Sequence, residues 1–285
     1  MRSILVCTDG SPYASVALRY ARDWAERLRL RVKVLFVEDL RLTRGPLVTG
    51  YYGPVGMAPS VAYPAFYDEL MRSIKQQGRR ALDEARDILA GFAGQIEYVV
   101  REGLVHDCIL QEARTVDVLC LGRRGEHGQW GGEDVGSTVQ KVLRHSERPV
   151  LVTPAEFRPL AGMLMAYDGS KSANLALREA CSLASEVGLS MTVIAVTSKG
   201  GHRPTYEAAL EEARQLVSAY EDVTAEFALV EGDEIEAVII AQAVAKQRDL
   251  IVMGAYGHSR IREWFLSSTT TGVLVRSPLP VLLVR

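Results

Sequence analysis

The stretch ILVCTDGSPYASVALRYA, residues 4–21, decides the fold because the chain contains it twice. It returns as MLMAYDGSKSANLALREA at residues 163–180. In both stretches a short apolar run ends at a DGS turn, and alanine and leucine then follow at helical spacing. This order predicts a strand that leads into a helix at the start of each of two similar domains.

Two later blocks repeat in the same order. VDVLCLGRRG at 116–125 matches RDLIVMGAYG at 248–257, and VLRHSERPVLV at 142–152 matches VLVRSPLPVLL at 273–283. Three separated blocks in one order are hard to obtain by chance. The sequence therefore predicts a duplication rather than two unrelated domains.

The first copy carries an insertion. Asp168 lies 159 residues after Asp9, but Gly257 lies only 132 residues after Gly125. The candidate is 40–66, where prolines and glycines alternate among aromatic residues, a composition that favours an irregular excursion. Three interpretations stay open: a lid over a ligand, an oligomer contact or a disordered loop. The predicted division is domain 1 at 1–153 with the insertion at about 40–66, a linker at 154–161, and domain 2 at 162–285.

Each copy alternates five strand-like runs with four helical stripes. The stripes expected in the first copy are 12–28, 68–90, 104–114 and 136–145. Short apolar strands between helices indicate an α/β domain with a parallel sheet covered on both faces. Right-handed crossovers then favour a doubly wound order, in which ligands bind beyond the carboxyl ends of the strands. Asp9, Val37 and the loop after Leu121 are expected to follow strand ends at that edge.

Composition excludes several classes of protein. Hydrophobic residues make up 48% and charged residues 24% of the 285, as in globular proteins, and the formal charge is −2. No overall field therefore recruits nucleic acid or an anionic membrane. No apolar stretch reaches the roughly 18 residues of a membrane span. The chain opens directly on a strand-like run, so we expect no secretory leader and a cytoplasmic location.

The cysteines and histidines do not form a recognisable metal or catalytic pattern. Cys7, Cys108, Cys120 and Cys181 lack CxxC spacing, and we interpret them as buried apolar residues, with a reactive thiol as the alternative. None of the five histidines has HExxH spacing or an evident serine or aspartate partner. The histidines are His106, His127, His145, His202 and His258. We expect no metal site built from side chains and no catalytic residues.

The strongest local feature is LGRRGEHGQWGGEDVGST, residues 121–138, which leaves a strand, crosses a glycine-rich loop and enters a helix. Glycines let backbone N–H groups approach an anion, and the start of a helix adds unpaired N–H groups. Ser137 and Thr138 add hydroxyls, and Arg123 or Arg124 could supply charge, so the loop suits a phosphate chain. The plain alternative is a flexible connection with Ser137 as a helix cap. The pattern is neither a P-loop nor a Rossmann fingerprint.

The TDGS turn, this late glycine loop, the VLRHSERPVLV block and the duplication together resemble the universal stress protein family over nearly the whole chain. Its nucleotide-binding members carry G-x-x-G, nine residues, then G-[ST]. Gly122, Gly125 and the pair Gly136-Ser137 match, with ten residues in the gap instead of nine. In the second copy Gly254 and Gly257 are followed by nine residues and then Ser267-Ser268, so the last glycine is lost.

The resemblance implies a Rossmann-like fold of the adenine nucleotide alpha hydrolase type that binds ATP, or ADP or AMP, with Mg²⁺ able to accompany the phosphates. Asp9 would lie beside the adenosine, Val37 would offer its backbone to adenine, and Gly103 would line the pocket. Asp9 or Ser11 could instead cap the first helix. The implied first site comprises Thr8, Asp9, Gly10, Val37, Gly103, Gly122, Arg123, Arg124, Gly125, Gly136, Ser137 and Thr138. The weaker second site comprises Asp168, Val196, Gly232, Gly254, Gly257, Ser267 and Ser268.

Three functions stay open: a nucleotide-binding regulator of stress or energy state, a nucleotide-independent interaction scaffold, and a slow ATPase. SGGxDS and HIGH, the motifs of related ATP-using enzymes, are absent. Family dimers associate through the last strand, so the resemblance also predicts that 149–152 and 280–284 pair or face each other within one chain. Such a chain would be a pseudo-dimer of its two domains, able to form a homodimer.

Overall fold

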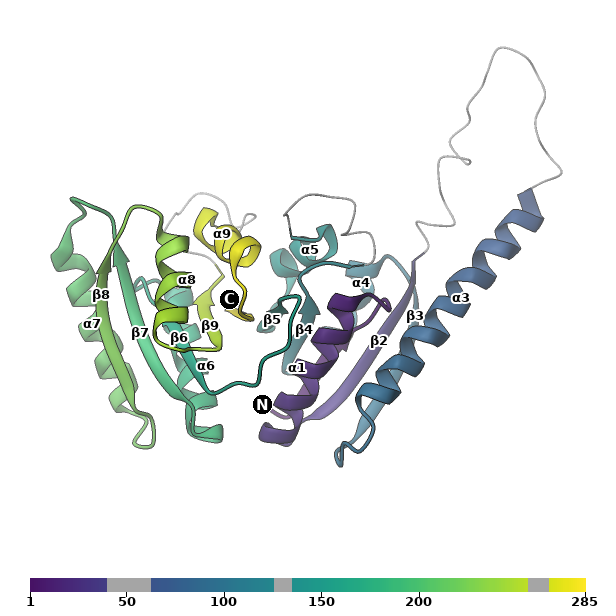
Figure 1. Ribbon diagram of the computed structural model, residues 1–285, viewed down its shortest axis with the longest axis horizontal. Coiled ribbons are helices and arrows are strands. Elements are labelled where there is room, and N and C mark those ends of the chain that lie inside the picture. Colours follow the sequence, from purple (N-terminus) through teal and green to yellow (C-terminus); the bar gives the residue numbers. More distant parts are fainter. Residues whose placement is uncertain (40–62, 126–134, 256–266) are drawn as a thin grey trace, which may run out of the picture.

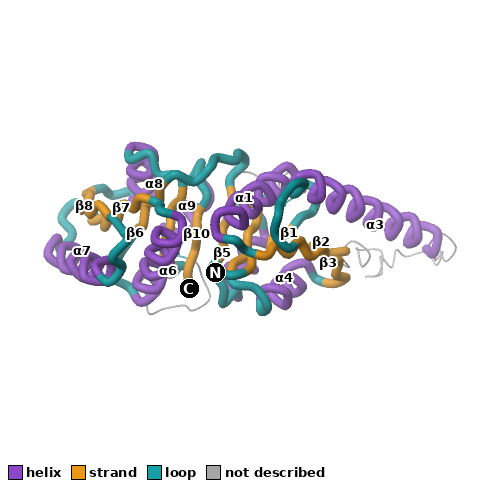
Figure 2. The backbone as a smooth tube through the Cα atoms, turned by 90° about the horizontal axis from the view of Figure 1, so that it is seen from below, coloured by secondary structure: helices purple, strands orange, loops and turns teal. Residues whose placement is uncertain are grey.

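The computed structural model describes residues 1–39, 63–125, 135–255 and 267–285, which form one ten-stranded sheet with helices on either side (Figures 1 and 2). The first repeat contains β1 (Ser3–Cys7), α1 (Pro12–Leu28), β2 (Arg31–Asp39), α3 (Tyr63–Ile88), β3 (Ile96–Gly103), α4 (Val105–Ala113), β4 (Val118–Gly122), α5 (Ser137–His145) and β5 (Val150–Thr153). The second contains β6 (Gly162–Ala166), α6 (Lys171–Val187), β7 (Ser190–Thr197), α7 (Arg203–Ser218), β8 (Ala225–Glu231), α8 (Ile235–Ala245), β9 (Leu250–Gly254), α9 (Ser268–Arg276) and β10 (Val281–Val284).

The predicted fold class is confirmed. The sheet order is β3-β2-β1-β4-β5-β10-β9-β6-β7-β8, so both repeats have the same doubly wound order. Within each repeat all neighbouring strands are parallel. The direction of winding reverses between β1 and β4, and between β6 and β9. In such sheets this switch point is where a crevice opens beyond the strand ends.

The two repeats meet through their last strands. β10 pairs antiparallel with β5, with Leu282 opposite Leu151 and Val281 opposite Val152. The expected pairing of these two segments is therefore present within the chain. It joins two five-stranded sheets into one continuous sheet, which Figure 1 shows with β5 near the middle of the molecule.

The apolar interior forms two layers, one on each face of the sheet, and each layer runs through both repeats. One layer packs under α1, α3, α6 and α7 and includes Leu151 and Leu282, which are fully buried. The other packs under α4, α5, α8 and α9. Because each apolar layer is continuous between the repeats, the two halves are expected to fold and unfold as one unit.

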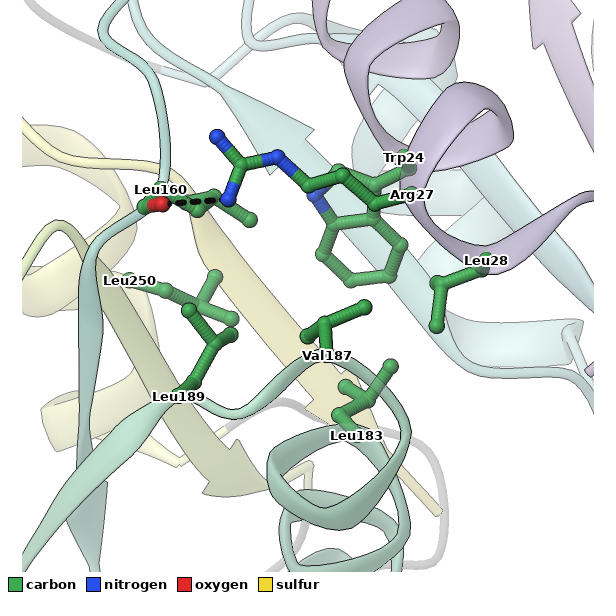
Figure 3. Close-up of a pocket in the computed structure, with 8 residues that line it drawn as sticks. All are labelled: Trp24, Arg27, Leu28, Leu160, Leu183, Val187, Leu189 and Leu250. Carbon is green, nitrogen blue, oxygen red and sulfur yellow. Dashed lines mark hydrogen bonds between the residues drawn. The ribbon is translucent and has the colours of Figure 1, made fainter.

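The segment between the repeats is fixed to α1. Arg27 Nη1 donates to the carbonyl of Leu160 at 2.7 Å, and the ring of Phe157 packs edge-on against that of Tyr20 with centroids 4.8 Å apart. Beside this contact Trp24 of α1 faces Val187 of α6 across a small apolar hollow (Figure 3). The linker and the two first helices therefore form a second contact between the repeats, besides the sheet.

Serine residues start the first helix of each repeat. Ser11 Oγ accepts from the N–H of Ala14 at 3.3 Å, and Ser170 Oγ accepts from the N–H of Ala173 at 3.1 Å. Of the two capping candidates, the structure therefore selects Ser11. The Asp9 carboxylate lies outside the helix and is held by the turn before it.

The predicted excursion at 40–66 is wrong over its last residues, because α3 begins at Tyr63. Pro64 falls in the first turn of this helix, where the missing N–H of proline would have no intrahelical partner in any case. The rest of the insertion, with its three interpretations, lies outside the described residues. So do His127, Gly257, His258 and most of both glycine-rich loops.

Candidate functional site

The TDGS turn and both ends of the first glycine loop meet beyond β1 and β4. A β-carbon built on Gly125 would lie 2.6 Å from Asp9 Oδ2, so the peptide of Gly125 lies directly against that carboxylate. At the far end of the loop the N–H of Gly136 donates to the carbonyl of Arg123 at 3.0 Å. Asp9, Gly125 and Gly136, which are far apart in the sequence, therefore line one edge of the sheet.

Three hydrogen bonds hold the turn that contains Asp9. Thr8 donates its N–H to the carbonyl of Leu35 at 2.9 Å, and its Oγ1 accepts from the N–H of Gly10 at 3.2 Å. Asp9 Oδ1 accepts from the N–H of Ser11 at 3.0 Å. Gly10 has φ of +79°, a conformation that glycine adopts at no steric cost. With Oδ1 used in the turn, Oδ2 is the atom that faces the glycine loop.

Gln77 of α3 also contacts this turn, and the sequence analysis did not identify it. Its Nε2 donates to the carbonyl of Asp9 at 3.0 Å. The adjoining Gly78 lets α3 approach β2, because a β-carbon there would lie 2.7 Å from the ring of Phe36. Gln77 lies beyond the insertion, and no local motif marks it as a site residue.

Gly122 lets the loop pack against the first turn of α1. A β-carbon on Gly122 would lie 2.8 Å from the carbonyl oxygen of Tyr13, and the counterpart on Gly254 would lie 2.8 Å from the nitrogen of Ala173. Both obstructions are backbone atoms of a helix. In each repeat the glycine is therefore required for close packing between the end of a strand and a helix.

We expect Gly122→Ala to lower the free energy of unfolding by about 1–3 kcal/mol, the usual cost of forcing extra volume into a packed site. Gly254→Ala is the matched variant in the second repeat and should cost a similar amount. Urea denaturation followed by far-UV circular dichroism measures both. An unchanged midpoint for Gly122→Ala would show that α1 moves aside freely.

The start of α5 differs from the start of α9. Gly136 is the N-cap of α5 and has no side chain that could accept from the first-turn N–H groups. At α9 the N-cap is Ser267, whose Oγ accepts from the N–H of Thr270 at 3.0 Å. The alternative in which Ser137 caps α5 is wrong, since Ser137 is the first helical residue. The first repeat thus leaves a helix start without a side-chain cap, as an anion site requires.

Val37 does not follow the end of its strand as expected, because β2 continues to Asp39. Pairing with β1 ends at the Cys7–Leu35 pair, however, and the carbonyl of Leu35 points to the β1 side. Backbone groups two residues apart on a strand point to the same side, so the peptide groups of Val37 face the space beyond β1. The backbone of Val37 therefore borders the space beyond the end of β1.

Gly103 ends β3 with φ of +155°, in the region that favours glycine. A β-carbon there would lie 3.0 Å from Cys108 Sγ. Its counterpart Gly232 is still more restricted, because a β-carbon would lie 2.5 Å from a methyl group of Val238. At both strand ends, therefore, close packing against a neighbouring side chain already requires glycine, whether or not a ligand binds.

The sequence allowed Arg123 or Arg124 to supply charge to the phosphates, and the structure places the side chain of Arg123 against the second repeat. Arg123 Nη1 donates to the carbonyls of Leu274 and Val275, at 3.1 and 2.9 Å, in the last turn of α9 in the second repeat. Burial lowers the pKa of Arg123, and Tyr13 beside it opposes that shift. Arg124 is the remaining arginine of the loop that can provide charge at the crevice.

The second repeat copies the turn but not its surroundings. Asp168 Oδ1 accepts from the N–H of Ser170 at 2.9 Å, and Gly169 has φ of +75°. Tyr167 replaces Thr8, and its hydroxyl hydrogen-bonds to Asn174 of α6. Burial raises the pKa of Tyr167 to about 12, with the charges of Glu212 and Asp168 adding to the shift. Val196 lies in β7 two residues beyond the last β6 pair, as Val37 does in β2.

None of the four cysteines has the environment of a reactive thiol. Burial raises the pKa of Cys7, and the nearby charges of Asp9 and Glu112 raise it further. Burial also raises the pKa of Cys108, Cys120 and Cys181. The thiolate is the nucleophilic form, so these side chains favour the interpretation as buried apolar residues. Within the described ranges no group of three or more His, Cys, Asp or Glu could hold a metal ion.

The comparisons with known proteins agree with this architecture. The model of the universal stress protein family matches residues 1–154 and again residues 162–285. Universal stress protein Slr1230 of Synechocystis is 30% identical over 304 residues, and the alignment covers all of both chains. The chain therefore belongs to the universal stress protein family, as a tandem member with two family domains.

A solved structure that matches nearly the whole chain has the same fold. A universal stress protein from Archaeoglobus fulgidus has a TM-score of 0.73 at 21% identity, covering 99% of this chain and 96% of that one. A shorter universal stress protein from the same species is described in complex with dAMP, with a TM-score of 0.37 over 44% of this chain and 97% of its own.

None of the helices in the described ranges is both long and apolar enough to span a membrane.

Proposed function

We propose that this protein binds an adenine nucleotide, ATP or its product ADP or AMP, in the first repeat and acts as a regulator of stress or energy state. One observation carries the proposal: the uncapped start of α5 opens on the edge where Gly125 lies against Asp9. Backbone N–H groups at a helix start favour phosphates, and the peptide groups of Val37 suit the edge of a base. Mg²⁺ can accompany the phosphates.

The second repeat is proposed to bind nucleotide more weakly. The hydroxyl of Ser267 already accepts the hydrogen bond from the N–H of Thr270, which could otherwise donate to a phosphate oxygen. Tyr167 also removes the hydroxyl that holds the glycine of the turn in the first repeat. A chain with one occupied site and one weak or empty site follows from these two differences.

Exchanging the two N-cap residues tests this asymmetry. Gly136→Ser should give α5 the self-cap of α9 and weaken nucleotide binding in the first repeat. The loss of one hydrogen bond to a charged group, about 1.5–3 kcal/mol, corresponds to an affinity roughly ten- to a hundredfold lower. Ser267→Gly should strengthen binding in the second repeat, at a cost in helix stability of only a few tenths of a kcal/mol.

Isothermal titration calorimetry of both variants with ATP and AMP measures these changes. Mass spectrometry of the small molecules released from denatured, purified protein identifies the natural ligand. If the wild-type chain neither retains nor binds any adenine nucleotide, the scaffold alternative replaces this proposal. Conversion of ATP to ADP with excess protein would instead support the slow ATPase.

We further infer a cytoplasmic location. All four cysteines are free in the structure, which suits a reducing compartment. The two domains are also proposed to act as a pseudo-dimer within one chain, since β5 and β10 pair antiparallel. A second association between two chains would have to use other surfaces.

A further inference from the structure

Arg123 connects the glycine loop of the first repeat to a helix of the second. Its Nη1 donates to three carbonyl oxygens, those of Leu274 at 3.1 Å, Val275 at 2.9 Å and Ser277 at 2.9 Å. All three belong to the last turn of α9 or to the residue that follows it. A side chain from the candidate site thus ends on the opposite repeat.

The end of α9 is well suited to receive a cation. The carbonyl of Leu274 would ordinarily accept from the N–H of residue 278, but that residue is Pro278 and has no N–H. The last carbonyls of any helix lack intrahelical partners and form the negative end of its dipole. Arg123 supplies donors and a positive charge at this position.

The backbone of Arg123 fixes the glycine loop at the same time. Its N–H donates to the carbonyl of Thr153 at 3.0 Å, and its carbonyl accepts from the N–H of Gly136 at 3.0 Å. The second bond closes the loop at the start of α5. A displacement of the Arg123 side chain would therefore move the peptide groups that lie next to Gly125 and Gly136.

At the equivalent position of the second glycine loop the side chain is too short for such a connection. Ala255 takes the place of Arg123 and keeps the backbone bond, donating to the carbonyl of Val284 at 2.7 Å. Its methyl group cannot reach the first repeat. Among the described residues of the two glycine loops, the contact therefore runs from the first loop to the end of α9.

We propose that Arg123 is a positioning residue through which the second repeat holds the two ends of the first glycine loop, at Gly125 and Gly136, in the positions that bind nucleotide. The nucleotide affinity of the first site then depends on a helix that does not touch the nucleotide. Because α9 starts directly after its N-cap Ser267 in the second glycine loop, and its last turn contacts Arg123, the state of the second site also reaches the first through one helix. This inference rests on the proposed nucleotide binding.

Arg285 provides a matched control. Its Nη1 donates to the carbonyl of Arg144 near the end of α5, at 3.1 Å, so it too links the end of a helix to the other repeat. Arg285 belongs to neither glycine loop. Loss of its side chain therefore removes a contact between the repeats without changing the backbone of either site.

The test compares Arg123→Gln, Arg123→Lys and Arg285→Gln by calorimetric titration with AMP, ADP and ATP. Arg123→Gln should bind all three about tenfold more weakly than the wild type, within the range of known coupling between sites. The factor should be similar for the three ligands, because one loop conformation is disturbed. Arg123→Lys keeps a cation that can donate to the same carbonyls and should recover most of the affinity. Arg285→Gln should bind as the wild type does.

Several outcomes would overturn the inference. A loss that grows from AMP to ATP would show that Arg123 contacts the phosphates directly. Equal losses of nucleotide affinity in Arg123→Gln and Arg285→Gln would show only that any weaker contact between the repeats lowers binding. Wild-type affinity in Arg123→Gln would show that Arg123 does not position the loop. If the wild-type chain binds none of the three nucleotides, the proposed function itself fails. If Arg123→Gln does not fold, Arg123→Lys takes its place: a small loss of affinity that is equal for AMP, ADP and ATP supports positioning, and a loss that grows with phosphate number overturns it.

Discussion

Replacing Leu282 with alanine is expected to lower the free energy of unfolding of the whole chain by about 2–5 kcal/mol, the usual cost of a large-to-small change in a closed core. Leu282 is fully buried and lies opposite Leu151 where β10 meets β5. Its side chain belongs to the apolar layer that runs under α1, α3, α6 and α7. The cavity would therefore form where the two repeats share one core.

The same variant tests whether the chain unfolds in one step. Differential scanning calorimetry should show a single transition for the wild type and a single, lower one for Leu282→Ala. Val244→Ala is the control, because Val244 is 56% exposed and its truncation should change stability by less than about 0.5 kcal/mol. Two separate transitions, with only one of them lowered, would contradict a core shared between the repeats.

Trp24→Ala is expected to lower the free energy of unfolding by about 3–5 kcal/mol, because a large, closely packed aromatic side chain is lost from the contact between α1 and α6. Trp24 is 2% exposed and lies beside the linker, facing Leu183 and Val187 of the second repeat (Figure 3). Urea denaturation followed by far-UV circular dichroism measures the loss. The cavity left by the substitution would join the apolar hollow beside it, so the surrounding side chains could not easily fill it.

Trp24→Phe separates packing from hydrogen bonding at this position. Trp24 Nε1 is buried and has no hydrogen-bond partner within the part of the chain that the structure describes. A buried, unpaired donor costs about 1–3 kcal/mol, so its removal should offset most of the lost ring volume. The phenylalanine variant is therefore expected to be far more stable than the alanine variant. Equal destabilisation of the two would show that the indole N–H is satisfied in solution.

The sequence predicted the fold well because its signals were local and duplicated. The block 4–21 and its copy 163–180 identified a strand, a turn and a helix, and the same logic identified the remaining elements. The start of α3 was missed because Pro64 indicates a loop in a sequence and yet fits the first turn of a helix. A residue type that both ends and begins helices cannot settle a boundary by itself.

The glycines of the candidate site could be identified from their spacing in the sequence. Contacts between residues far apart in the sequence could not. Gly122, Gly125 and Gly136 were identified by spacing. The structure places Gly125 against Asp9, Gly122 against the first turn of α1, and Gly136 next to the backbone of Arg123. Arg123 was one of two arginines that could supply charge to a phosphate chain, and the carbonyls that its side chain reaches lie about 150 residues further on, in the other repeat. No pattern within the loop reveals that Pro278 leaves a carbonyl without its usual donor.

The continuous sheet also limits which proteins this chain can join. Two separate five-stranded sheets would present four edge strands, each a template for pairing with another chain. Here β5 and β10 cover each other, and β3 and β8 are the strands left at the ends of the sheet. Covalent linkage keeps the covered pair at an effective concentration in roughly the millimolar range, above that of any competing protein in solution. We therefore expect single-domain relatives to be excluded from this edge, so that the two proposed nucleotide sites would stay in a fixed one-to-one ratio.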